Sequence, residues 1–90
     1  MDPIKVLIVD DHPLFRQGIA DVLENDPGLS VVAQAADGEV ALHYAMEYRP
    51  DIVVMDVNLP YANGLRATRR ILNDLPETKV ITLTGYDDAE

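Results

Sequence analysis

Two short apolar runs, each ending in carboxylates, constrain the fold more than any other feature of this chain. The first run covers residues 6–9 and is followed by Asp10 and Asp11, and the second covers residues 52–55 and is followed by Asp56. Short, unbroken runs rich in β-branched residues are typical of strands that are buried on both faces of a parallel sheet. We therefore predict a parallel sheet with helices packed against both faces.

The segments around these runs predict an alternation of strands and helices, which is typical of βα units. Apolar residues recur at helical spacing in three segments: 13–24, 40–48 and 65–72. For the second helix we predict an inner face made of five residues: Val40, Ala41, Tyr44, Ala45 and Tyr48. Chain breakers end the three helices at 25–28, 50–51 and 75–76, and two further strands are predicted at 29–35 and 79–83.

The order of the strands follows from their composition and from the handedness of the connections. Right-handed crossovers apply to each βα unit, and the most apolar strands, 6–9 and 52–55, belong in the centre. We therefore predict a doubly wound α/β sheet with the order 2-1-3-4. Ligands bind such sheets beyond the carboxyl ends of the strands, where the winding direction reverses. That point lies between the first and third strands.

Asp10, Asp11 and Asp56 all follow strands that end at this point. Unpaired carboxylates a few ångströms apart repel by about 4 kcal/mol per pair at an effective dielectric constant of about 20. Such a cluster requires a cation or raised pKa values. The candidate ligands are carboxylate oxygens, and neither a cysteine nor a histidine at ligand-type spacing accompanies them. Such a set of hard oxygen ligands favours Mg²⁺ or Mn²⁺.

Each acidic residue also has a simpler explanation when it is considered alone. Asp11 precedes His12 and Pro13 and could act only as a helix cap, with Asp10 solvated beside it. Asp56 could cap a helix or begin a turn. The presence of all three acids at one edge of the sheet favours the metal site.

Other polar residues are predicted near the same edge. The hydroxyl of Thr84 could donate to an anion, and Gly85 would allow a backbone N–H to approach it closely. Taken alone, however, these two residues are better explained as an ordinary strand end with a turn glycine. The loop that begins at Asn58 could present amides to phosphate oxygens. His12 and His43 lack ligand-type spacing. His43 is interpreted as a surface residue, and His12 lies beside the acidic pair but is assigned no role at neutral pH.

Composition narrows the class of protein. The 90 residues fit one domain, over 1–90, and the net charge of −9 argues against direct contact with nucleic acid. No cysteine is present, which is consistent with the cytoplasm, and no segment resembles a signal peptide or a membrane span. Three arginines on the third helix are interpreted as a solvated face: Arg66, Arg69 and Arg70.

Three segments together resemble a known family. VLIVDDHPLFRQGI, DIVVMDVNLPYANG and VITLTGYDD are similar to the motifs of bacterial response-regulator receiver domains. The stretch DDHPLFRQG most resembles the NarL/FixJ (LuxR-type) subfamily, whose members usually carry a DNA-binding helix-turn-helix domain after the receiver. The resemblance implies a flavodoxin-like fold, a sensor histidine kinase as partner and control of transcription through an output domain.

The resemblance also implies roles for individual residues. Asp56 would be the phosphoacceptor, and Mg²⁺ would be held by Asp10, Asp11, Asp56 and the backbone carbonyl of Asn58. Thr84 would donate a hydrogen bond to the phosphoryl group. The backbone amides of Val57, Asn58 and Gly85 would hold its oxygens. The chain would be a phosphoacceptor rather than an enzyme, with at most weak autophosphatase activity.

The family pattern has five strands and five helices, whereas this sequence ends after its fourth predicted strand. We therefore expect a C-terminally incomplete receiver without the last two helices, the fifth strand and its phosphate-binding lysine. Lys5 and Lys79 would lie at the opposite end of the sheet. The fourth strand would form an exposed edge, and we expect a homo-oligomer assembled through it.

Two other functions are also compatible with the sequence. The first is a receiver-like interaction module that self-associates without efficient phosphorylation, because the lysine is missing. The second is an Mg²⁺-dependent phosphohydrolase with an aspartate nucleophile. Asn58 disfavours this second function, because it stands where an acid–base residue would be required.

Overall fold

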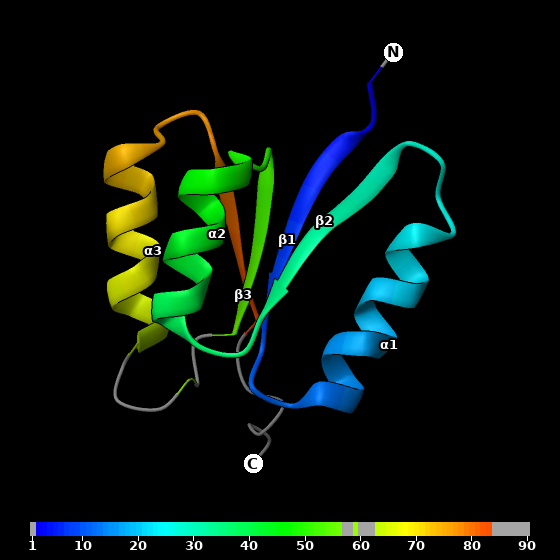
Figure 1. Ribbon diagram of the computed structural model, residues 1–90, viewed down its shortest axis with the longest axis horizontal. Coiled ribbons are helices and arrows are strands. Elements are labelled where there is room, and N and C mark those ends of the chain that lie inside the picture. The colour runs from blue at the N-terminus through cyan, green and yellow to red at the C-terminus, as the bar shows by residue number, and fades with distance from the viewer. Residues whose placement is uncertain (1, 57–58, 60–62, 84–90) are drawn as a thin grey trace.

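The computed structural model describes residues 2–56, 59 and 63–83, and they form strands and helices in strict alternation (Figure 1). The elements are β1 (Ile4–Val9), α1 (Pro13–Glu24), β2 (Leu29–Ala35), α2 (Gly38–Tyr48), β3 (Ile52–Asp56), α3 (Asn63–Asp74) and β4 (Lys79–Leu83). The predicted elements are confirmed to within two residues at most ends. Among the described residues, no helix is both long and apolar enough to cross a membrane.

The four described strands form one parallel sheet with the order β2-β1-β3-β4. The predicted order is therefore confirmed, and the two most apolar strands, β1 and β3, lie in the centre. Val9 pairs with Met55, which brings the carboxyl ends of these two strands side by side. The chain winds in opposite directions on either side of this pair, so a ligand-binding edge is expected there.

Helices cover both faces of the sheet, α1 on one side and α2 with α3 on the other (Figure 1). Alternate residues of β1 serve the two faces: Leu7 and Val9 pack in the cluster with α2 and α3, whereas Val6 and Ile8 pack with α1. This division explains why β1 is apolar at consecutive positions, since both of its faces are buried.

The predicted inner face of α2 is only partly correct. Ala41 and Ala45 are fully buried, but Val40 and Tyr48 are 38% and 39% exposed. Leu42 instead packs against the core beside them. The two small alanines let the helix approach the sheet closely, so the stripe that faces the core is narrow and the larger apolar residues flank it.

The ends of α2 follow from local chemistry. Asp37 caps the helix, because its carboxylate accepts a hydrogen bond of 2.9 Å from the backbone N–H of Val40. At the other end, Arg49 adopts a left-handed conformation with φ 48°, and its N–H donates to the carbonyl of Ala45. Helices commonly end in this way before a proline, and Pro50 follows.

The amino ends of the strands are joined around Asp51, far from the acidic edge. Its carboxylate accepts the Lys5 backbone N–H at 2.8 Å, and its carbonyl accepts the Lys79 backbone N–H at 3.0 Å. Both lysines therefore lie at the end of the sheet opposite to Asp56, as predicted.

Candidate metal centre

Asp10 and Asp56 lie side by side at the carboxyl ends of the two central strands. Each residue directly follows a member of the Val9–Met55 pair, and the backbone N–H of Asp10 still donates to Ala35 on β2. Both aspartates are only 2% exposed. Burial of two carboxylates at one point is costly unless a cation or hydrogen-bond donors compensate.

Asp11 and His12 complete a cluster of four residues with Asp10 and Asp56. One possible ligand atom from each of the four lies within 4.8 Å of all the others. The side chain of Asp11 is 33% exposed and that of His12 is 61% exposed, so the cluster is open to solvent on their side. The clustering of the three acids, which the sequence predicted, is confirmed.

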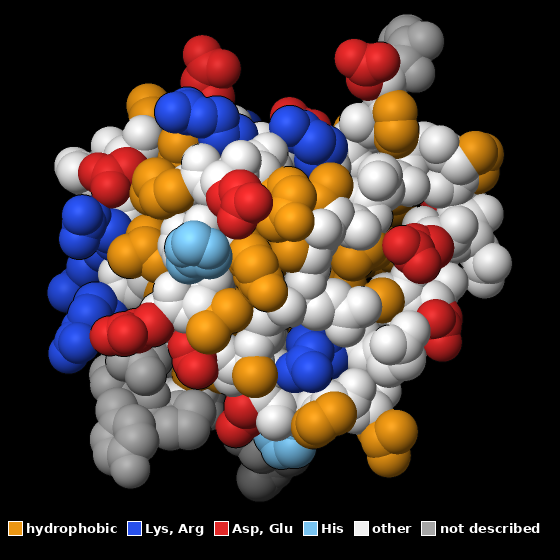
Figure 2. Space-filling model, in the orientation of Figure 1, with side chains coloured by type: hydrophobic (Ala, Val, Ile, Leu, Met, Phe, Trp, Pro, Cys, Tyr) orange, Lys and Arg blue, Asp and Glu red, His pale blue; other side chains and the backbone are white. Residues whose placement is uncertain are grey.

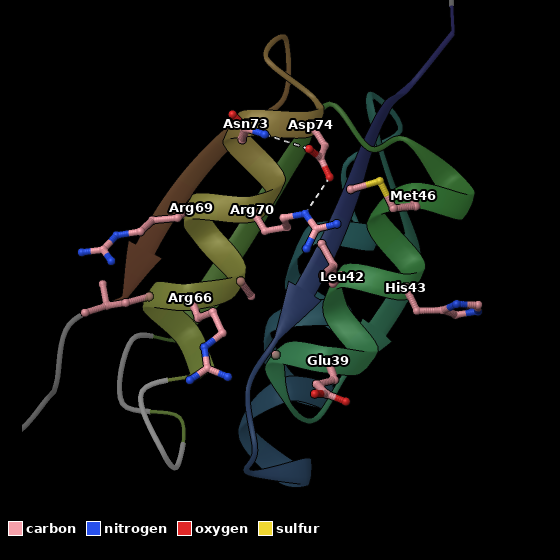
Figure 3. A pocket seen from close by; sticks show the side chains of 12 residues that line it. Glu39, Leu42, His43, Met46, Arg66, Arg69, Arg70, Asn73 and Asp74 are labelled. Carbon is pink, nitrogen blue, oxygen red and sulfur yellow. Dashed lines mark hydrogen bonds and ion pairs between the residues drawn. The ribbon is translucent and has the colours of Figure 1, made fainter.

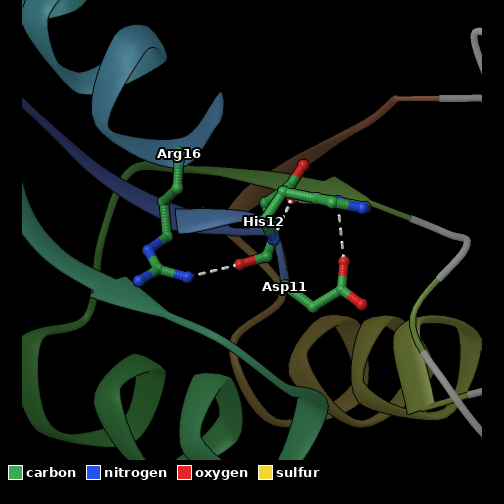
Figure 4. Close-up of polar contacts among 4 residues, drawn as sticks. Asp11, His12 and Arg16 are labelled. Carbon is green, nitrogen blue, oxygen red and sulfur yellow. Dashed lines mark hydrogen bonds and ion pairs between the residues drawn. The ribbon is translucent and has the colours of Figure 1, made fainter. Parts of the chain in front are cut away.

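The His12 ring contacts both Asp10 and Asp11, and Figure 4 shows it beside Asp11. Its Nδ1 lies 3.2 Å from Oδ1 of Asp10 and 3.0 Å from Oδ1 of Asp11. Its backbone N–H donates to the same Asp10 oxygen at 2.8 Å, which orients that carboxylate. No role was predicted for His12, whereas the structure places its ring against both acids. The sequence did contain a sign of this contact, because His12 directly follows the two acidic residues.

The role of Asp11 as a helix cap is also wrong. The helix α1 begins at Pro13 and His12 occupies the N-cap position, so Asp11 lies before the cap. Proline is well suited to this first position because it has no N–H to leave unsatisfied. Asp11 is left available to the cluster.

Arg16 supports the cluster from the first turn of α1 (Figure 4). Its Nη1 donates a hydrogen bond of 2.6 Å to the backbone carbonyl of Asp10. This contact ties the end of β1 to the helix that follows the acidic pair. Sequence reasoning missed it, because a single arginine on a helix gives no sign of the direction in which it points.

Comparison with known proteins places this geometry in a family. The sequence profile described as the response regulator receiver domain matches residues 6–90. The chain belongs to the response regulator receiver family.

The relatives of this receiver domain include transcriptional regulators. It is 42% identical to the transcriptional regulatory protein DegU of Brevibacillus brevis over 85 residues, covering 94% of this chain and 36% of DegU. It is 51% identical to the response regulator GacA of Pseudomonas syringae, again covering 94% of this chain and 40% of GacA. The chain thus spans about two fifths of the length of these relatives.

Solved structures show the same fold as this receiver domain. A two-component response regulator of the LuxR family from Aurantimonas superposes with a TM-score of 0.85 at 40% identity, covering 92% of this chain and 59% of that one. The receiver domain of the putative regulator NarL from Mycobacterium tuberculosis gives a TM-score of 0.88 at 29% identity, covering 99% and 72%. Both agree with the flavodoxin-like fold and the subfamily predicted from sequence.

Four residues predicted for the receiver site lie outside the described part of the chain: Val57, Asn58, Thr84 and Gly85. Their roles stay predictions. The last described residue of β4, Leu83, pairs with Asp56.

Two predicted surface groups of the receiver domain lie away from the acidic cluster. His43 is 73% exposed on α2 and lies 3.4 Å from Glu47. Figure 2 shows basic side chains gathered on the side of the molecule formed by α3. Arg70 there donates to Asp74 at 2.9 Å, and this hydrogen bond is the main reason that the pKa of the Asp74 carboxyl is lowered.

A surface groove of about 1070 Å³ lies between α2 and α3 (Figure 3). Arg70 points into it, whereas Arg69 points away. Leu42 and Met46 of α2 line it, but none of the four clustered residues does. The groove is therefore separate from the acidic cluster.

The residues of the acidic cluster suit Mg²⁺. The described part of the site offers three carboxylates, two from the residues that follow β1 and one from the end of β3. Mg²⁺ prefers hard oxygen ligands of this kind. Their mutual repulsion also supplies a reason for the site to take up a cation.

Proposed function

We propose that this receiver domain accepts a phosphoryl group on Asp56 from a sensor histidine kinase, in an Mg²⁺-dependent reaction. The observation that carries the proposal is the position of Asp56, which is buried at the end of β3 and clustered with Asp10 and Asp11. Membership of the receiver family supports it. Asp10, Asp11, Asp56 and the backbone carbonyl of Asn58 would hold the ion.

In the proposed step, a carboxylate oxygen of Asp56 forms a bond to phosphorus while the nitrogen–phosphorus bond of a phosphohistidine breaks. The electron pair of that bond stays with the departing imidazole nitrogen. Such transfers depend mainly on in-line positioning and neutralisation of charge. When bound, Mg²⁺ supplies charge neutralisation between the carboxylates and the phosphoryl oxygens.

The chain's own residues would position the reacting groups. The central strand fixes Asp56, and the backbone N–H of His12 holds Asp10 in place. We propose that the Thr84 hydroxyl and the backbone amides of Val57, Asn58 and Gly85 donate to the phosphoryl oxygens. These are the contacts that a new anion would need once it is attached to Asp56.

We further propose that phosphorylation controls a DNA-binding output domain, with the receiver acting in the cytoplasm as a phosphoacceptor and at most a weak autophosphatase. The support is that relatives carry names such as transcriptional regulatory protein and that the receiver covers about two fifths of their length. The receiver itself has an acidic net charge of −9, so DNA contact is assigned to another domain.

Incubation with acetyl phosphate and Mg²⁺, followed by intact-mass measurement, tests this proposal. The chain is expected to gain one phosphoryl group, and Asp56→Asn is expected to abolish the gain. Asp21→Asn is a matched control, because Asp21 is an exposed aspartate on α1. A gain that persists in Asp56→Asn would contradict the proposal. No gain in a folded, Mg²⁺-binding chain would favour the phosphorylation-independent interaction module instead.

A further inference from the structure

We propose that the acidic cluster also binds a divalent ion of the Zn²⁺ class, with the imidazole of His12 as a ligand beside Asp10, Asp11 and Asp56. This inference rests on the proposed function, since both require the three carboxylates to hold a cation. It adds a fourth residue to the site and a second class of ion.

The spacing of the His12 ring supports this role. Its Nδ1 lies 3.0 Å from Oδ1 of Asp11 and 3.2 Å from Oδ1 of Asp10. Bonds of about 2.0–2.2 Å from Zn²⁺ to nitrogen and oxygen place neighbouring ligands of one ion roughly 3.0–3.5 Å apart. The ring nitrogen lies at hydrogen-bonding distance from both oxygens, and ligands that share one ion have the same separation.

The kinds of ligand distinguish the two classes of ion. Mg²⁺ strongly prefers oxygen ligands, whereas neutral imidazole suits Zn²⁺, Ni²⁺ and Cu²⁺. Four residues converge on the site, and four-coordinate sites are the ones that Zn²⁺ prefers. The exposure of His12, at 61%, leaves its ring free to adjust around an entering ion.

The two ions would compete, because they use the same three carboxylates. An ion held by His12 occupies the position that Mg²⁺ needs. Zn²⁺ is therefore expected to inhibit phosphoryl acceptance by Asp56, and raised Mg²⁺ concentrations are expected to relieve the inhibition.

Imidazole NMR of the 90-residue chain gives a direct test, because the sequence contains only two histidines. Long-range ¹H–¹⁵N spectra are recorded at about pH 7.5, where unperturbed histidine is mostly neutral. Stoichiometric Zn²⁺ is expected to shift the Nδ1 resonance of His12 to a metal-bound position, and Mg²⁺ is not. His43 on α2 serves as the internal reference.

Calorimetric titrations of variants measure the contribution of His12 to affinity. Loss of a supporting residue at a metal site already costs about 10–100-fold in affinity, so His12→Ala is expected to weaken Zn²⁺ binding at least tenfold. The affinity for Mg²⁺ is expected to change by less than about threefold, since imidazole is a poor ligand for Mg²⁺. His43→Ala is the matched control and should leave both affinities unchanged. His12→Gln provides a second substitution, and circular dichroism checks that each variant folds.

The possible failures separate this inference from the proposed function. If His12→Ala and His12→Gln both retain Zn²⁺ affinity, or the His12 resonance does not shift, the role of His12 is overturned while Mg²⁺ binding stands. If Asp11→Ala changes the affinity for neither ion, the acidic cluster is not a metal site and both proposals fail. Loss of Zn²⁺ and Mg²⁺ binding together in His12→Ala would also overturn the selective role of His12.

Discussion

Asp10, directly after β1, and Asp56, the last residue of β3, lie one residue beyond the Val9–Met55 pair, and each is only 2% exposed. Parallel strands bring their carboxyl ends to the same edge, so two residues that are 46 positions apart in sequence meet there. The fold thus concentrates negative charge where it can be balanced by a cation. Binding and stability at this edge should therefore be linked.

Asp10→Asn is expected to stabilise the metal-free chain and to weaken Mg²⁺ binding. It removes one buried charge but keeps an oxygen that can accept the backbone N–H of His12. Relief of part of the repulsion corresponds to a gain of about 1–3 kcal/mol in the free energy of unfolding. Urea denaturation measures this change with and without Mg²⁺.

Mg²⁺ itself should stabilise the unsubstituted chain by about 2.7 kcal/mol at 100 times its dissociation constant. The same concentration should have much less effect on Asp10→Asn. An equal response of both chains to Mg²⁺ would contradict a role for Asp10 in holding the ion.

Arg16→Ala is expected to destabilise the fold and loosen the acidic edge. It removes the 2.6 Å hydrogen bond to the carbonyl of Asp10, and hydrogen bonds to charged groups contribute about 1.5–3 kcal/mol. Chemical denaturation measures the loss, and amide exchange reports mobility at residues 10–12. Arg69→Ala, on the exposed side of α3, is the control and should change the stability little. Equal stability of the two variants would rule out the supporting role of Arg16.

Thr78→Val tests the end of the sheet opposite to the acidic cluster. The buried hydroxyl of Thr78 donates to the carbonyl of Pro50 at 2.8 Å. Its removal leaves this carbonyl without that donor, at a cost of about 1–3 kcal/mol. Thr82→Val is the control, because Thr82 is exposed on β4. Thermal unfolding should show a lower melting temperature for the first variant and little change for the second.

Self-association through β4 is expected at high concentration. This strand ends the described four-stranded sheet, and Ile81 on it is 51% exposed beside its partner Val54. An exposed strand edge with apolar side chains can pair with a second copy, and a charge on it opposes pairing. Size-exclusion chromatography with light scattering should show oligomers that Ile81→Lys abolishes. A monomer at high micromolar concentration would show that this prediction is wrong.

Charged control variants sharpen that measurement. Leu72→Lys adds the same charge at another exposed apolar residue, on α3. It should leave the oligomers intact if β4 forms the contact. Equal disruption by both variants would indicate a general effect of charge.

The sequence alone determined the sheet and the position of its chemistry. The runs at 6–9 and 52–55 are apolar at every position, which only burial on both faces explains, and this placed β1 and β3 in the centre. The ends of these runs then located Asp10, Asp11 and Asp56 at one edge. Local patterns were sufficient because the alternation of strands with helices and the right-handed crossovers allow only a few strand orders.

The tertiary structure alone decided which side chains reach one another. Val22 on α1 is 70% exposed and Tyr48 on α2 is 39% exposed, although both follow helical apolar spacing, because the sheet is contacted by a narrower face of each helix. His12 and Arg16 reach the acidic edge through the geometry of the turn from β1 into α1. Spacing along a chain does not specify the direction of a side chain; packing around it does.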